Sequence, residues 1–174
     1  MSKEIVDRCS FLELEIREQF GEIRLTIEMV PSTCWFSNAR NNISKSGWDR
    51  LRKTTYEKAN YRCEICGGQG KRHPVECHEI WLFDDKEYIQ KLGGLIALCP
   101  NCHEVKHIGL ASSHGRGDAA RNYLANINSW TDKQTQEYLS LVKQIWLERS
   151  KHEWKLNLDW LKKQNVNINK DLPE

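Results

Sequence analysis

The feature that most constrains the fold of this 174-residue chain is a pair of Cys-x-x-Cys motifs. The motifs supply four cysteines, Cys63, Cys66, Cys99 and Cys102. The tight turn after the first cysteine of each motif aims two sulfurs at one point, so two motifs can hold one tetrahedral zinc ion. A redox motif is the alternative, but it needs a single Cys-x-x-Cys at a strand-to-helix step. We therefore predict a structural zinc site with four thiolate ligands.

The length of chain between the two motifs predicts the local fold. Residues 67–98 separate the pairs, whereas a compact zinc ribbon has about 15–20 residues there. The intervening chain must fold back to bring the pairs together. Short apolar runs predict strands at 74–80 and 95–98, followed by a helix that begins near Asn101.

Three histidines belong to this predicted ββα unit. His78 falls on the first strand, and His103 and His107 fall one helical turn apart on one face of the helix. A histidine after Cys-x-x-Cys can serve only to cap or pack. Three of them converging beside a zinc site instead predict a second site, for a divalent ion.

Residues 61–108 resemble HNH endonucleases of the zinc-stapled ββα-metal type. That family carries Cys-x-x-Cys, then Glu-x-His-His-Ile on the first strand, then Asn-Leu before Cys-x-x-Cys-His and a further histidine. This chain has Glu-Cys-His-Glu-Ile at 76–80. The resemblance implies hydrolysis of DNA phosphodiester bonds. It also implies a catalytic ion (Mg²⁺, Mn²⁺, Ni²⁺ or Zn²⁺) on His78, His103 and His107.

Two positions depart from the family pattern. Glu79 stands where the family has its general-base histidine, and Gly94 stands where an asparagine orients that base. The base is therefore either His78 or Glu79. A glutamate, with a reference pKa of about 4.3, gives less driving force for proton abstraction. On an ideal strand Glu76 and His78 share a face and Glu79 points away, unless a bulge turns it inward.

These departures motivate an alternative function. The chain would then be a catalytically weak or inactive zinc-binding module that keeps the HNH fold and binds nucleic acid or a protein partner. A bound metal besides the zinc distinguishes the two hypotheses, because the nuclease needs it and the module does not.

The charge distribution favours a nucleic-acid partner only locally. The formal net charge is +2, from 26 basic and 24 acidic residues, but residues 40–73 hold nine Lys or Arg against three acids. Such a stretch can contact phosphates or be a solvated helix face. The candidate DNA-binding residues are Arg50, Lys53, Lys58, Arg62, Lys71 and Arg72. No base-reading motif is visible, so we expect little sequence specificity.

Cysteine usage and hydropathy indicate the compartment. Four of the seven cysteines have metal-ligand spacing, which argues against a secreted disulfide framework. The N-terminus lacks the apolar run of a signal peptide, and no stretch approaches about 18 apolar residues. We expect a cytoplasmic protein with no membrane partner. The oligomeric state is left open.

The predicted fold class is α+β, with three regions. Residues 1–45 form a β-rich N-terminal extension, residues 46–110 the HNH core, and residues 111–174 a helical C-terminal extension. Apolar alternation over 12–17 and 23–29 predicts an N-terminal hairpin, although the first half has the composition of a helix.

The remaining elements follow from capping signals. Helices are predicted over 2–9, over 46–60 with Ser46 as the cap, and over 118–130. A further helix follows a capping box at Thr131–Gln134. Asp84 and Asp85 are read as caps of a short helix, through Leu92, inside the hairpin connection. Alternation over 154–160 predicts a strand, which could complete the N-terminal sheet.

Overall fold

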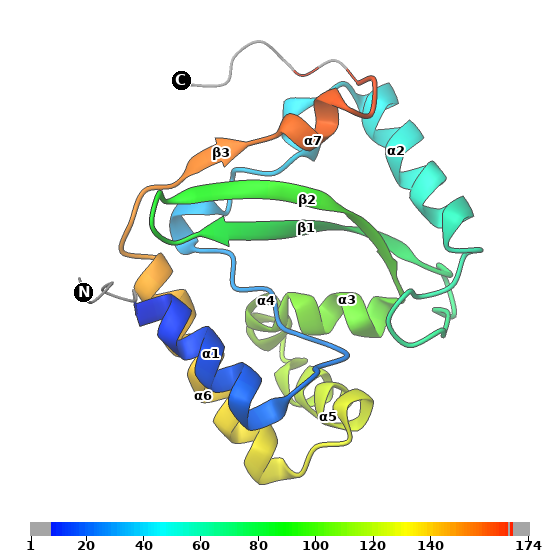
Figure 1. Cartoon of the computed structure of the whole chain (residues 1–174). Helices are drawn as coiled ribbons and strands as arrows, with labels where there is room; N and C mark the ends of the chain where they lie inside the picture. Colours follow the sequence, from blue (N-terminus) through cyan, green and yellow to red (C-terminus); the bar gives the residue numbers. More distant parts are fainter. Residues whose placement is uncertain (1–7, 167, 169–174) are drawn as a thin grey trace.

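The computed structural model describes residues 8–166 and 168. In these residues it contains seven α-helices and one three-stranded sheet, which confirms a mixed α+β fold (Figure 1). The elements are α1 (Arg8–Phe20), α2 (Lys45–Lys58), β1 (Glu76–Asp84), β2 (Ile89–Leu98), α3 (Pro100–Lys106), α4 (Ile108–Ser113), α5 (Gly117–Asn128), α6 (Asp132–Arg149), β3 (Lys155–Asn157) and α7 (Asp159–Lys162). Two 3₁₀ turns, η1 (Ser32–Cys34) and η2 (Arg40–Asn42), precede α2.

The β1–β2 hairpin is longer than the sequence predicts. The strands pair antiparallel from Glu76 opposite Leu98 to Asp84 opposite Ile89, with a bulge between Ile80 and Trp81. The predicted helix from residue 84 to residue 92 is wrong. Asp84 does cap, but it closes a turn: its Oδ1 accepts from two successive backbone N–H groups, at 3.1 Å each, and the chain then returns as β2.

The predicted N-terminal hairpin is also wrong, and its first half is the helix α1. The side chains of Leu12, Ile16 and Phe20, spaced four residues apart, face α6, while Leu14 is 49% exposed. This helical spacing prevails over the apparent alternation. The helix predicted over 2–9 lies mostly outside the described residues.

The second half of the predicted N-terminal hairpin, residues 23–29, alternates in burial without joining a sheet. Leu25 and Ile27 are buried. Their backbone N–H groups donate to side chains of the C-terminal helices, Leu25 to Asn128 Oδ1 at 3.1 Å and Ile27 to the Tyr138 hydroxyl at 3.1 Å. Side-chain acceptors here replace a neighbouring strand. The predicted C-terminal strand is reduced to β3, and its expected pairing with an N-terminal sheet is wrong, because β3 pairs parallel with β2.

Helix caps agree with the sequence in part. The capping box at Thr131 and Gln134 is present at the start of α6. In α2, Ser44 and not Ser46 is the N-cap, and its side chain accepts from Gly47 N.

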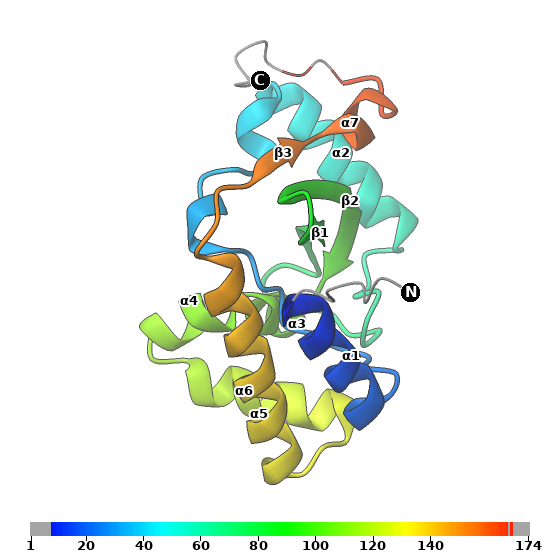
Figure 2. The same cartoon turned by 60° about the vertical axis from the view of Figure 1, so that its left-hand side comes forward.

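The hairpin separates two hydrophobic clusters (Figures 1 and 2). One contains Trp48 of α2, Leu92 of β2 and Leu161 of α7. The other contains Val105 of α3 and Leu124 of α5, among others. Helix α1 packs along α6 on that second side. Over residues 8–166 and 168, no helix has the length and apolar character needed to cross a membrane.

Candidate metal centres

The four motif cysteines come together as predicted. Their sulfurs all lie within 4.8 Å of one another, and the Sγ atoms of Cys66 and Cys99 are 3.6 Å apart. A tetrahedral zinc site with Zn–S distances of about 2.3 Å has sulfur–sulfur edges of about 3.8 Å. Three of the four residues are buried, and none forms a disulfide. The residues present therefore fit a zinc ion.

Backbone geometry shapes each half of the cysteine cluster. Gly67 has a φ of +74°, which lets the chain turn back so that Gly68 N donates to Cys66 Sγ at 3.4 Å. A Cβ on Gly70 would lie 2.2 Å from the His73 carbonyl oxygen, so a side chain at that position would force a shift. Pro100 starts α3 directly after Cys99.

The cluster lowers the pKa of one thiol. A hydrogen bond with Cys102 brings the pKa of Cys63 down to about 4, and backbone hydrogen bonds add to the effect. The same contact raises the pKa of Cys102. A thiolate is the form that binds zinc, so the chain stabilises one ligand in the required state.

Tyr123 is a component of this site that the sequence reasoning missed. Its hydroxyl, presented by α5, donates to Cys66 Sγ at 3.5 Å and lies 3.8 Å from Cys99 Sγ. No spacing rule links residue 123 to the motifs. Only the packing of α5 on α3 brings the hydroxyl there.

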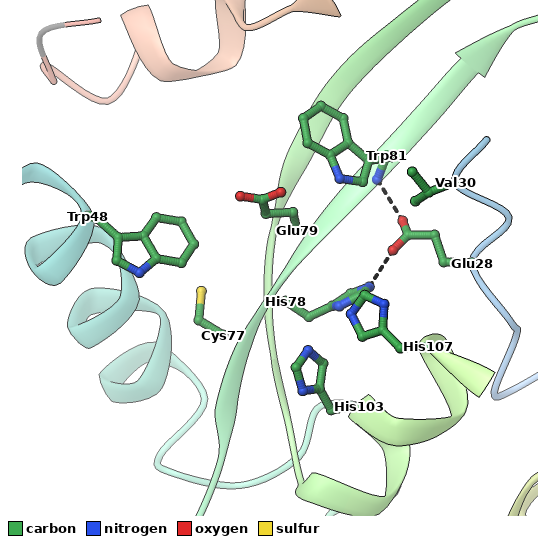
Figure 3. Close-up of a pocket in the computed structure, with 9 residues that line it drawn as sticks. All are labelled: Glu28, Val30, Trp48, Cys77, His78, Glu79, Trp81, His103 and His107. Carbon is green, nitrogen blue, oxygen red and sulfur yellow. Dashed lines mark hydrogen bonds and ion pairs between the residues drawn. The ribbon is translucent and has the colours of Figure 1, made fainter. Parts of the chain in front are cut away.

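The three predicted histidines also converge. One ring nitrogen from each of His78, His103 and His107 lies within 4.8 Å of the others. The ring centroids are 4.9 to 5.2 Å apart. His78 projects from β1, His103 lies within α3, and His107 is the residue at which α3 ends (Figure 3). Three imidazoles at these distances fit a divalent metal ion.

Glu76 holds one imidazole in place. Its Oε2 lies 2.5 Å from His103 Nδ1 in a hydrogen bond. A hydrogen donated from Nδ1 leaves Nε2 as the lone-pair donor. Metal-binding histidines are commonly oriented by a carboxylate in this way. The expectation that Glu76 and His78 share a strand face agrees with this placement.

Glu28 is a second residue that the sequence reasoning missed. Its Oε1 accepts from Trp81 N at 2.9 Å, and its Oε2 lies 2.5 Å from His78 Nε2. The side chain is 11% exposed. In the sequence Glu28 is an ordinary polar position of an alternating run, so no signal marks it as part of the site.

Glu79 and Gly94 lie away from the three histidines. Glu79 and Cys77 project from β1 on the side of α2, opposite to His78 (Figure 3). The Glu79 carboxylate accepts from Arg40 N at 3.2 Å. The bulge follows residue 79 and does not turn its side chain toward His78. A Cβ on Gly94 would have Trp160 and Ile80 as its nearest neighbours.

A cavity of about 130 Å³ opens beside the three histidines. It is lined by residues from both faces of β1, which is an edge strand. The lining residues are Glu28, Val30, Trp48, Cys77, His78, Glu79, Trp81, His103 and His107. The volume is enough for an ion with a few ligands, since one water occupies about 30 Å³ in the liquid.

Burial sets the protonation of the groups around the cavity. Burial lowers the pKa of His103. His107 keeps part of its surface exposed, but desolvation within the site, followed by repulsion between protonated rings of His107, His78 and His103, lowers its pKa to about 4. Both imidazoles are therefore held neutral, the form that binds metals. Burial raises the pKa of Glu79. Lys106, which donates to Thr26 Oγ1 at 2.8 Å, has its pKa lowered by burial.

The predicted DNA-binding residues differ in their surroundings. Arg50 donates to the carbonyl oxygens of residues 164 and 165, at 3.1 and 2.7 Å. Arg62 donates to the Gly67 carbonyl at 3.2 Å. Both arginines thus have structural contacts. All six residues are exposed, and the four without such contacts lie on α2 and on the segment before β1: Lys53, Lys58, Lys71 and Arg72.

Comparison of the chain with protein-family models, with curated proteins and with solved structures finds no match.

Proposed function

We propose that this protein is a metal-dependent endonuclease of the HNH type, which hydrolyses phosphodiester bonds of DNA and holds a structural zinc on its four clustered cysteines. The observation that carries the proposal is the convergence of His78, His103 and His107 where β1 meets α3, next to the cysteine cluster. The cysteine cluster and the histidine site share helix α3. A zinc ion on the cysteines would therefore fix the position of the imidazoles of His103 and His107.

Each residue of the site has a role in this proposal. His78, His103 and His107 would hold a divalent ion, and Glu76 would orient His103 through its Nδ1. The ion, when bound, would polarise the scissile phosphate, lower the pKa of the attacking water so that it loses its proton, and stabilise the leaving oxygen. Lys106, whose ammonium donates to Thr26 Oγ1, would add a positive charge next to His107.

Glu79 stands at the position of the general base in the HNH family, but its surroundings support a different role. Its carboxylate is hydrogen-bonded to the backbone of Arg40 and lies on the α2 side of β1. In this position it ties the segment before α2 to the edge of the sheet. We therefore propose that Glu79 is a structural residue and that the reacting groups come from the histidine side of β1.

The cavity suits a phosphate group better than a base. Its volume of about 130 Å³ is small for a nucleotide. The substrate backbone would therefore lie across its mouth, with contacts from the exposed cations Lys53, Lys58, Lys71 and Arg72. Contacts to phosphates position a nucleic acid without reading its sequence.

The test is cleavage of supercoiled plasmid in the presence of Mg²⁺, Mn²⁺, Ni²⁺ or Zn²⁺. We expect nicking by the wild-type protein and its loss in His103→Ala, with one zinc per chain retained. His114→Ala is the matched control, because His114 is exposed in the turn after α4. We expect Glu79→Gln to keep cleavage within about tenfold of the wild type, since general-base loss typically costs 10²–10⁴-fold.

Absence of cleavage with every ion, from folded protein that holds one zinc, would overturn the nuclease proposal for DNA. Such a result would favour the alternative, a zinc-binding module that binds nucleic acid or a protein partner. A measurement of plasmid binding by the same preparations would then separate those two kinds of partner.

A further inference from the structure

We infer that Glu28 is a fourth ligand of the metal ion in the histidine site, so that this site is built from three imidazoles and one carboxylate. The inference rests on the metal site of the proposed function but not on the reaction. It assigns a direct role in metal binding to a segment that precedes the ββα unit.

The extended segment 23–29 fixes the position of the Glu28 side chain. Glu28 N donates to the Lys106 carbonyl at 3.2 Å, which docks the backbone on α3. The carboxylate then reaches the edge of β1, where Oε1 accepts from Trp81 N at 2.9 Å. One carboxylate oxygen is thus committed to the sheet edge, and the other, Oε2, faces the histidines (Figure 3).

Oε2 of Glu28 and Nε2 of His78 have no hydrogen bond that satisfies them. The two atoms lie 2.5 Å apart, yet their alignment is not that of a hydrogen bond, and both are fully enclosed. His78 is 4% exposed. Buried polar atoms without partners are rare and costly, and an unplaced ion is one established explanation. A cation next to both atoms would satisfy both lone pairs.

Glu76 provides an internal comparison. Its Oε2 is also 2.5 Å from a histidine nitrogen, His103 Nδ1, but that pair does form a hydrogen bond and is partly exposed. Glu76 therefore behaves as an outer carboxylate that orients a ligand. Glu28 instead places an enclosed oxygen that has no hydrogen bond against Nε2 of His78, and on this ground we assign it as a ligand.

The ligand set limits which ion binds. Imidazoles suit Zn²⁺, Ni²⁺, Fe²⁺ and Cu²⁺, whereas Mg²⁺ is bound mainly by oxygen ligands and retained water. Three nitrogens and one carboxylate oxygen thus favour a transition-metal ion over Mg²⁺. The carboxylate also adds a negative charge to the inner sphere, which would strengthen the binding of a dication.

The experiment measures Co²⁺ binding to the full chain with zinc on its cysteines, by calorimetry and by visible absorption. We expect wild-type protein to bind one Co²⁺ per chain in addition to the zinc. Glu28→Gln keeps an oxygen to accept from Trp81 N but lacks the charge, and we expect its Co²⁺ affinity to fall by more than about 100-fold. Loss of an outer-shell partner typically costs 10–100-fold. Glu22→Gln, at an exposed position directly before this segment, is the matched control and should bind as wild type.

Glu28→His gives a second test that does not depend on the glutamine variant. If residue 28 is a ligand, exchanging its oxygen for a nitrogen changes the visible spectrum of bound Co²⁺. An unchanged spectrum in Glu28→His, or a Glu28→Gln affinity within tenfold of wild type, would overturn the inference and leave the histidine site intact. If wild-type protein binds no Co²⁺ beyond the cysteine site, the metal site of the proposed function fails as well.

Discussion

The guanidinium of Arg149 forms a two-point contact with the carboxylate of Asp85, through Nε at 2.7 Å and Nη2 at 2.6 Å. Both side chains are nearly buried, at 7% and 9% exposed. The same arginine also reaches Glu13 of α1 at 2.8 Å and lies 4.7 Å from the centre of the Phe83 ring. One side chain at the end of α6 therefore links the tip of the β1–β2 hairpin to two helices.

We predict that Arg149→Ala lowers the free energy of unfolding by about 3–5 kcal/mol, because it leaves the buried Asp85 carboxylate without its partner. The measurement is chemical denaturation followed by circular dichroism. Lys151→Ala is the control, since it breaks an exposed pair with Glu148 and should change stability by about 1 kcal/mol or less. Equal effects of the two substitutions would contradict this role of Arg149.

The hydroxyl of Tyr123 contacts the cysteine cluster from α5, and this contact gives a second prediction. Tyr123→Phe removes the hydrogen bond to Cys66 Sγ while keeping the ring. We expect zinc affinity to fall by about 10–100-fold, as for other groups that support metal ligands. Competition with a colorimetric chelator measures it. Tyr61→Phe, at a 47% exposed position, should not differ from the wild type.

The sequence predicted the parts of the fold that local rules determine. The two Cys-x-x-Cys motifs correctly predicted that four sulfurs meet, and the one-turn separation of His103 and His107 correctly predicted that both join one group of histidines. The Thr131 capping box correctly marked the start of α6. Each of these signals is set by residues within a few positions of one another, although the meeting of the two cysteine motifs also needs the hairpin between them.

The sequence failed where distant partners decide. Asp84 has the chemistry of a cap in either a helix or a turn, and only pairing of β1 with β2 selects the turn. Leu25 and Ile27 alternate as in a strand, but their acceptors are side chains about a hundred residues away in the chain. Glu28 and Tyr123 reach the metal sites through such contacts, so no motif could reveal them.

One of these distant acceptors gives a third prediction. The Tyr138 hydroxyl, in a fully enclosed position on α6, accepts from Ile27 N. Tyr138→Phe would leave that buried N–H without a partner. We expect a loss of about 1–3 kcal/mol in the free energy of unfolding, measured by urea denaturation. Stability equal to that of the wild type would mean that water or a shifted backbone satisfies Ile27 N.

The lowered pKa of His107 gives a prediction for protein whose histidine site is free of metal. In the unfolded chain histidine titrates near 6.5, whereas in the folded protein burial and the two neighbouring imidazoles bring the pKa of His107 to about 4. Between these values the unfolded state binds more protons. Stability is therefore highest above pH 6.5 and decreases as the pH falls toward 4.

Removing the titrating group isolates this contribution from those of other residues. We expect the free energy of unfolding of wild-type protein to decrease relative to that of His107→Gln as the pH is lowered from 7 to 5. Urea denaturation at intervals of half a pH unit measures the difference, and NMR titration of the His107 ring reports its pKa directly. A difference that stays constant with pH would show that His107 titrates normally in the folded chain. In that case protons would already compete with a metal ion for this ligand near pH 6.5.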